Sequence, residues 1–89
     1  MSSETYQRLN SQASVSSVGS THTVERNGTY YEQFTVRFTD SEVQYTHENP
    51  EHLDYLVQLL ERQFGLNVVS PVRAPDFEGT LHVEQRVAE

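Results

Sequence analysis

Histidine and carboxylate side chains are the groups of this 89-residue chain that could do chemistry. The chain has four histidines: His22, His47, His52 and His82. Two of them adjoin a glutamate, in the pairs His47-Glu48 and Glu51-His52. A metal ion needs several such ligands to converge, and this spacing matches no zinc signature. A His/Glu metal site is therefore a minor alternative, and we expect no metal and no other cofactor.

The sequence offers little support for catalysis. It contains no cysteine, which excludes thiol catalysis, thiolate metal sites and disulfides. Glu32 is the carboxylate on an apolar strand face that could act as a general acid or base. We expect His22 to lie opposite Glu32, where the two form an ordinary cross-strand pair. The sequence shows no catalytic triad, phosphate-binding glycine loop or nucleotide fingerprint, so we expect a protein that is not an enzyme.

The charge balance is unusual for so small a chain. Thirteen acidic residues face six arginines and no lysine, for a formal charge of −7. A GC-rich genome would replace lysine by arginine, and adaptation to high salt would favour an acidic surface. The composition resembles that of halophilic proteins, although glutamate greatly outnumbers aspartate here. The same acidity could also serve a function, either by binding a partner with a basic surface or by mimicking nucleic acid. This functional interpretation is the weaker one, because the acidic residues are scattered and form no run.

Residues 29–39 alternate between apolar and polar types, which predicts a central strand with one buried face. The preceding Arg26-Asn27-Gly28 segment indicates a hairpin. We expect a three-residue loop with Gly28 left-handed in a bulge, because this register places the apolar residues on one face. The expected inward pairs are Val24 with Tyr30 and Val18 with Val36.

After the central strand, Asp40-Ser41 predicts a tight turn into a third antiparallel strand. The expected pairs are Phe38 with Val43, Val36 with Tyr45, and Phe34 with His47. The first three strands would then form a meander.

Asn49-Pro50-Glu51 has the residues of a helix start, and the helix should run to about Phe64. One apolar stripe follows helical spacing: Leu53, Leu56, Val57, Leu60 and Phe64. Gly65 then predicts a left-handed cap, with Leu66 packing behind it. We expect this stripe to cover the meander.

The remaining segments complete an α+β fold of order β-β-β-α-β-β. Residues 66–72 and 80–87 are predicted strands, with Leu81, Val83 and Val87 inward, and 71–79 is a predicted loop. The sheet should be mainly antiparallel, with four or five strands and one helix on one face. Residues 1–14 lack any period and predict a flexible polar tail, so residues 15–89 would form the single domain.

Two helix residues are hard to bury in that fold. Tyr55 and Leu59 lie about 120° from the main stripe on a shoulder shared with His52 and Gln63. Either the protein's own strands or N-terminal segment cover this shoulder, or a second protein does. We expect a small acidic interaction or regulatory protein that self-associates through the shoulder, as a homodimer.

The outer face of the sheet offers a second surface. It is expected to carry Tyr31, Gln33, Thr35 and Arg37. An aromatic ring and an arginine on a strand platform can stack nucleic-acid bases. The charge of −7 opposes phosphate, so a nucleic-acid-associated regulator is the alternative function.

No apolar run is long enough for a membrane span, and the N-terminus lacks the pattern of a secretory signal. We therefore expect a cytoplasmic protein with no membrane partner.

If the acidic excess reflects adaptation to salt, stability should depend on salt. The midpoint of thermal unfolding should rise as salt increases from about 0.1 M to several molar, because charge repulsion and surface hydration both respond. Circular dichroism melts across this range measure the effect. A midpoint that stops rising once ordinary screening is complete would remove support for halophilic adaptation.

Overall fold

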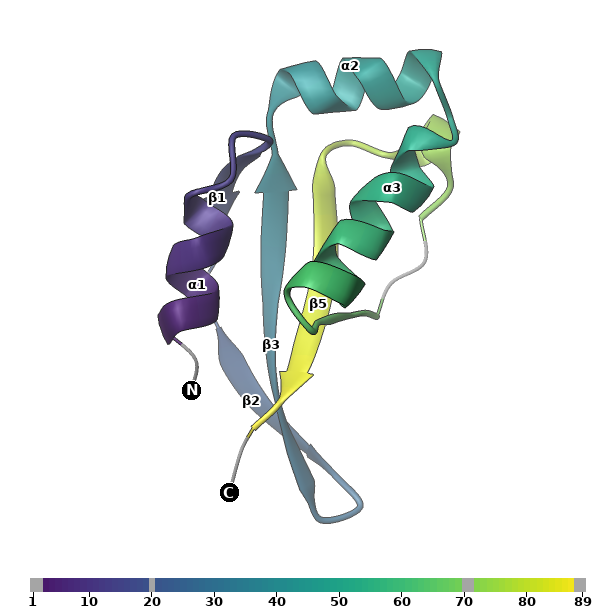
Figure 1. Cartoon of the computed structure of the whole chain (residues 1–89). Coiled ribbons are helices and arrows are strands. Elements are labelled where there is room, and N and C mark those ends of the chain that lie inside the picture. Colours follow the sequence, from purple (N-terminus) through teal and green to yellow (C-terminus); the bar gives the residue numbers. More distant parts are fainter. Residues whose placement is uncertain (1–2, 20, 70–71, 88–89) are drawn as a thin grey trace.

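A computed structural model describes residues 3–19, 21–69 and 72–87 of the chain (Figure 1). Within these residues, one antiparallel five-stranded sheet packs with three helices, which confirms the predicted α+β class. The elements are α1 (Ser3–Asn10), β1 (Val15–Val18), β2 (His22–Arg26), β3 (Thr29–Phe38), α2 (Asp40–Glu48), α3 (His52–Gln58), a π-helical turn (Leu59–Gln63), β4 (Asn67–Val68), a 3-10 turn (Ala74–Asp76) and β5 (Thr80–Arg86).

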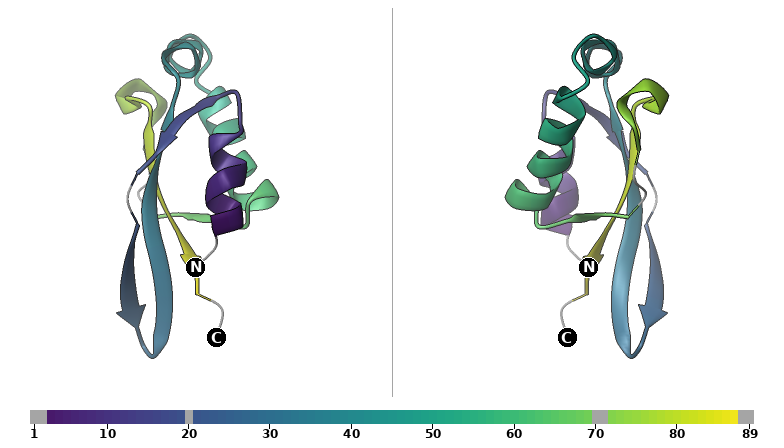
Figure 2. Two further views of the ribbon diagram at one scale, coloured as in Figure 1. Left: turned by 90° about the vertical axis from the view of Figure 1, so that its left-hand side faces the viewer. Right: turned by 90° about the vertical axis from the view of Figure 1, so that its right-hand side faces the viewer.

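Strand β3 is the centre of the sheet. Both β1 and β2 pair with one edge of β3, β5 pairs with the other edge, and β4 pairs with β5. Helices α1 and α3 lie on the same face of the sheet, and no α-helix of the described residues lies on the opposite face (Figure 2). Phe34, Val36 and Phe38 of β3 point into the covered face and are buried there. The core therefore lies between the sheet and these two helices.

The N-terminal segment is part of this core. Residues 3–10 form α1, and the Leu9 side chain is fully buried. Tyr6 packs its ring against Phe34 at 5.9 Å and donates its hydroxyl hydrogen to the carbonyl oxygens of Val18 and Gly19. The predicted flexible tail is therefore wrong for these residues. A helix of two turns shows too little periodicity to be detected in a polar sequence, and its stability comes from docking.

The hairpin register differs from the predicted one. Asn27 and Gly28 both have positive φ, at 52° and 82°, as a two-residue type I′ turn requires. Val24 therefore faces Tyr31 and not Tyr30.

The same register separates the expected His22 and Glu32 pair. His22 faces Gln33, and Thr23 faces Glu32. Glu32 is buried on the covered face of the sheet and accepts a hydrogen bond of 3.4 Å from the amide of Gln85. The hydrogen-bond partner of Glu32 therefore comes from β5, on the edge of β3 opposite to β2.

The predicted pairing of Val18 with Val36 is confirmed, although the hairpin is different. Both facts hold because the registers of β1 and β2 on β3 differ by one residue. The backbone N–H of Gly19 still donates to the carbonyl oxygen of Thr35, at 2.8 Å. A β-carbon at Gly19 would collide with the Thr35 hydroxyl, so glycine fits this close approach. The prediction failed because it treated residues 18–24 as one uninterrupted strand.

The predicted third strand is helix α2. Thr39 caps it: the Thr39 hydroxyl accepts a 3.4 Å hydrogen bond from the backbone N–H of Glu42. Threonine followed three residues later by glutamate is a recognised helix-start pattern, and it outweighs the alternation that favoured a strand. The expected pairings of Val43, Tyr45 and His47 with β3 are therefore wrong.

Strand β5 occupies the edge of β3 that the meander would have used. It pairs Leu81 with Val36 and Val83 with Phe34, and both β5 side chains are buried as predicted. Strand β4 is shorter than the predicted 66–72 segment, of which residues 70 and 71 lie outside the described residues. The expected loop at 71–79 contributes an unforeseen core residue, Phe77, which is fully buried.

The helical stripe is confirmed. Val57, at the margin of the stripe, is half-buried. The other four members are buried: Leu53, Leu56, Leu60 and Phe64. Gly65 closes the helix at φ 68°, and Leu66 behind it is buried, as expected. In the described part of the chain, no helix is long and apolar enough to cross a bilayer.

The turn geometry can be tested at Asn27. Valine at this position should destabilise the protein by about 1–2 kcal/mol, because a β-branched residue is disfavoured at positive φ. The control Asn27→Gly should unfold at a urea concentration close to that of wild type. If Asn27→Val leaves the urea midpoint unchanged, Asn27 has negative φ and the three-residue loop is correct.

Candidate functional site

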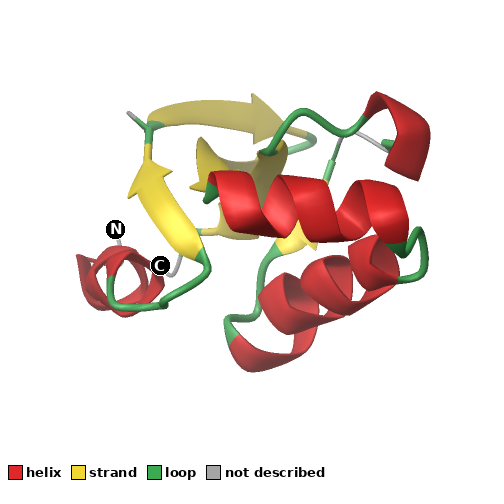
Figure 3. Ribbon diagram, turned by 90° about the horizontal axis from the view of Figure 1, so that it is seen from above, coloured by secondary structure: helices red, strands yellow, loops and turns green. Residues whose placement is uncertain are grey.

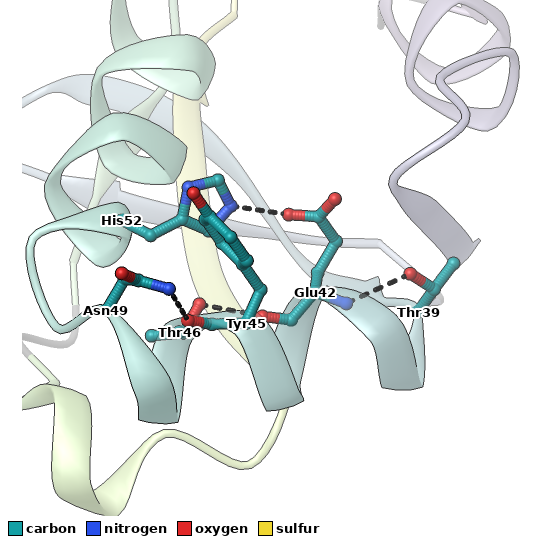
Figure 4. Close-up of polar contacts among 6 residues, drawn as sticks. All are labelled: Thr39, Glu42, Tyr45, Thr46, Asn49 and His52. Carbon is teal, nitrogen blue, oxygen red and sulfur yellow. Dashed lines mark hydrogen bonds and ion pairs between the residues drawn. The ribbon is translucent and has the colours of Figure 1, made fainter.

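Four side chains gather where helices α2 and α3 meet. Glu42 and Tyr45 come from α2, and His52 and Tyr55 from α3; we call this group the aromatic corner. The His52 ring meets the Tyr45 ring edge-on, with centroids 4.6 Å apart, and stacks on the Tyr55 ring at 5.3 Å. Figure 4 shows His52 beside Tyr45 and within reach of Glu42. The imidazole therefore lies between two tyrosines.

A break between the helices creates this arrangement. Pro50 lacks a backbone N–H, so α2 cannot continue through it. Asn49 is the last capping residue of α2. Its backbone N–H donates to the carbonyl oxygen of Tyr45 at 2.8 Å, and its side-chain amide donates to the same oxygen. The chain then turns, and α2 crosses the end of the sheet while α3 runs back along its face (Figure 3).

The spacing of the four residues explains why they share one side. Glu42 and Tyr45 are three residues apart on α2, as His52 and Tyr55 are on α3, and residues at this spacing lie on one helix face. The turn brings the two faces together. The opposite side of α2 faces the interior: Thr46 is fully buried there, and its hydroxyl donates to the Glu42 carbonyl oxygen of the same helix at 2.8 Å.

A short contact with a carboxylate fixes the imidazole. His52 Nε2 lies 2.6 Å from Glu42 Oε1, and both side chains are largely shielded from water, at 16% and 25% exposure. With Glu42 ionised, His52 donates through Nε2, which sets the plane of the ring. The ring orientation in turn positions the two tyrosines that pack against it.

The tyrosines themselves face the solvent. Tyr45 is 52% exposed and Tyr55 is 58% exposed, which places them among the few large apolar side chains that the fold leaves uncovered. With Glu42 and His52 they line a shallow, open hollow of about 510 Å³. The hollow can receive a protruding side chain, but it does not enclose a ligand.

The helices that carry the corner are strongly acidic. Between Arg37 and Arg62 the sequence contains no arginine and no lysine. The same stretch holds six acidic residues: Asp40, Glu42, Glu48, Glu51, Asp54 and Glu61. All of them except Glu42 are exposed, so this end of the molecule has a negative surface.

The structure separates the residues of the expected shoulder. Tyr55 and His52 belong to the aromatic corner, whereas Leu59 is 7% exposed and belongs to the core. Leu59 begins the π-helical turn, in which two consecutive leucines face inward. The expectation that Leu59 contributes to an interface is therefore wrong.

Helix α1 lies beside the C-terminal end of that shoulder. Arg8 donates to the backbone oxygen of Gln63 at 3.0 Å, and its guanidinium lies 4.8 Å from the centre of the Phe64 ring. The N-terminal helix therefore contacts the shoulder at its C-terminal end, whereas Tyr55 stays exposed. The Gln63 side chain remains exposed on the outer surface.

The outer face of the sheet carries the four predicted residues Tyr31, Gln33, Thr35 and Arg37, as the register with β5 shows. Two of them already have partners within the protein. The Arg26 guanidinium stacks 4.3 Å from the centre of the Tyr31 ring, and Gln33 donates to Glu84 Oε1 at 3.1 Å. Arg37 remains exposed.

Glu84 occupies the middle of this outer face. It is 5% exposed and forms an ion pair with Arg26 at 2.5 Å. The hydrogen bond from Arg26 holds the pKa of Glu84 below its ordinary value, against the opposing effect of burial, and Gln33 adds to the lowering. Neither residue was predicted from sequence: the expected hairpin placed Arg26 in its loop, and no pairing was assigned to the strand that carries Glu84.

The histidines do not converge. His22 and His82 are exposed on the sheet, His47 Nε2 lies 2.7 Å from the carbonyl oxygen of Phe77, and His52 contacts Glu42. Among the residues that the structure describes, no three His, Asp or Glu side chains are placed to hold a metal ion.

Glu84 should make stability depend on acid pH. Its lowered pKa means that the unfolded chain takes up this proton first as pH falls, so the stabilisation is complete above the unperturbed value of about 4.3 and is lost below it. Glu84→Gln should therefore lose less stability than wild type between about pH 5 and pH 3, measured by urea unfolding. The control Glu61→Gln removes an exposed charge and should keep the wild-type acid sensitivity. Equal acid sensitivity in wild type and Glu84→Gln would contradict the assignment.

Comparisons with protein-family models, curated protein sequences and solved structures found no match for this chain.

Proposed function

We propose that this protein is a small non-enzymatic interaction module and that the aromatic corner is its contact surface. The observation that carries the proposal is the exposure of Tyr45 and Tyr55, each more than half open to solvent. Tyrosine is enriched at protein interfaces, where its ring supplies contact area and its hydroxyl a hydrogen bond. Two such residues side by side are typical of the centre of a contact surface.

The rigidity of the corner supports the same role. Both tyrosines pack on His52, and His52 is held by Glu42. Side chains that are already ordered lose less conformational entropy when a partner binds. The corner is thus prepared for contact before a partner arrives.

The shape of the corner favours binding over catalysis. Its hollow is open, whereas substrate pockets bury most of their ligand and exclude water. The two side chains in it that could exchange protons, His52 and Glu42, are engaged with each other in a hydrogen bond. We therefore propose no catalytic residue and no cofactor at the corner. The cytoplasmic location expected from the sequence is kept as part of the proposal.

A second copy of the chain is the alternative partner. Contact between two aromatic corners would bring the acidic surfaces of α2 and α3 together, and their repulsion would have to be screened by salt. The loss of Leu59 to the core also removes the aliphatic residue expected at a homodimer interface. A different protein is therefore the preferred partner.

Nucleic acid has less support as a partner. The ring of Tyr31 and the amide of Gln33 are used within the protein, and the Glu84 carboxylate lies beside Gln33 on the face that would meet the phosphates.

Site-specific cross-linking tests the contact surface. A photoreactive phenylalanine analogue replaces Tyr45 or Tyr55 in cells of the organism that encodes the chain. Tyr30, which is 53% exposed on β3, is the matched control position. We expect a discrete cross-linked product from positions 45 and 55 and little from position 30.

The mass of the product identifies the partner. A product of twice the chain mass indicates a second copy, and any other mass indicates a different protein, identified by mass spectrometry. Equal labelling at all three positions, or no product at 45 and 55, contradicts the proposed surface.

A further inference from the structure

The charge around the aromatic corner indicates the chemistry of its partner. The stretch between Arg37 and Arg62, which contains both helices that form the corner, holds six acidic residues and no arginine or lysine. A surface with one sign of charge attracts the opposite sign and speeds association with it. A cationic partner is therefore favoured, and an acidic one is repelled.

The exposed rings indicate which cation. Guanidinium groups stack on aromatic faces, and this protein uses that contact twice internally, with Arg26 over Tyr31 and Arg8 over Phe64. In the described residues, no arginine of the chain stacks on Tyr45 or Tyr55. These two rings can therefore accept a guanidinium from another molecule.

Glu42 supplies the second half of such a site. Its Oε1 is hydrogen-bonded to His52. Among the described residues, the Glu42 carboxylate makes no other side-chain hydrogen bond. The other carboxylate oxygen can accept an N–H from outside, and Glu42 lines the same hollow as the two tyrosines. A planar guanidinium can stack on a ring and donate to a carboxylate at once, whereas an ammonium lacks the stacking face.

We propose that the aromatic corner binds an arginine side chain in a basic segment of a partner protein, with the guanidinium stacked on Tyr45 or Tyr55 and hydrogen-bonded to Glu42. This inference rests on the proposed function and adds the identity of the contacting group. A second copy of the chain fits less well, because its own arginines are few and its charge is −7. A nucleic acid is repelled by the same acids.

Fluorescence anisotropy with synthetic peptides tests the proposal on the full chain. The probe is a dye-labelled, Gly/Ser-spaced peptide with several arginines, and the matched peptide carries lysine at the same positions. We expect the arginine peptide to bind about tenfold more tightly than the lysine peptide. Comparable affinity for the two peptides would overturn the assignment of arginine.

Variants locate the binding site. The double variant Tyr45→Ala, Tyr55→Ala should weaken binding of the arginine peptide about tenfold, whereas Tyr45→Phe, Tyr55→Phe should retain it because the rings remain. Tyr30→Ala is the control for loss of an equally exposed tyrosine. If the alanine pair unfolds, as judged by circular dichroism, Glu42→Gln against Glu61→Gln provides the second comparison. Only the change at Glu42 should weaken binding.

Three further outcomes are decisive. Peptide binding that ignores the tyrosines and falls with any acidic substitution is general charge attraction, and it overturns the site. Tyrosine-dependent binding of a single-stranded oligonucleotide would show that the partner is an anionic nucleic acid and not a cationic protein segment, and it overturns the proposal as well. Cross-linking at positions 45 and 55 without binding of the arginine peptide overturns this inference alone and leaves the interaction surface standing.

Discussion

The helix cap at Thr39 is the constraint on which the rest of the structure depends. Strand β3 ends at Phe38, and the Thr39 hydroxyl then accepts the N–H of Glu42 and starts α2. Such a cap contributes about 1 kcal/mol, a small energy with a large topological effect. Because the chain leaves the sheet at this point, the free edge of β3 pairs with β5 from the far end of the sequence. The same cap sets the phase of α2 and so the direction in which Glu42 and Tyr45 point.

Features with strong local periodicity were predictable from sequence. The α3 stripe, the left-handed Gly65 and the inward residues of β5 follow from side-chain spacing or from the backbone freedom of glycine. The register of β2 could not be predicted in the same way, because both a two-residue and a three-residue turn suited the Asn27-Gly28 segment. The three-residue turn was chosen on the assumption that all apolar residues share one face. Val24 contradicts that assumption, since it pairs with Tyr31, which lies on the outer face of the sheet.

The candidate site shows the same division. His52 and Tyr55 were recognised because they follow helical spacing in a helix with a clear start. Tyr45 and Glu42 were missed because the segment was assigned to a strand, in which Tyr45 would face the core. The pattern that could have found them is Thr39 with Glu42 three residues on, followed by the break at Asn49-Pro50. Two residues at helical spacing on each side of such a break are brought to one corner.

The one-residue shift between β1 and β2 also affects how the sheet meets other chains. In a regular strand, side chains alternate strictly between the two faces of the sheet. Between Val18 of β1 and His22 of β2 this alternation shifts by one residue, so an added regular strand could not follow both. At the other edge, β4 offers two residues of regular ladder. A long, regular strand edge is what another chain needs in order to pair and extend a sheet. Neither edge described here is both long and regular, which disfavours edge-to-edge aggregation.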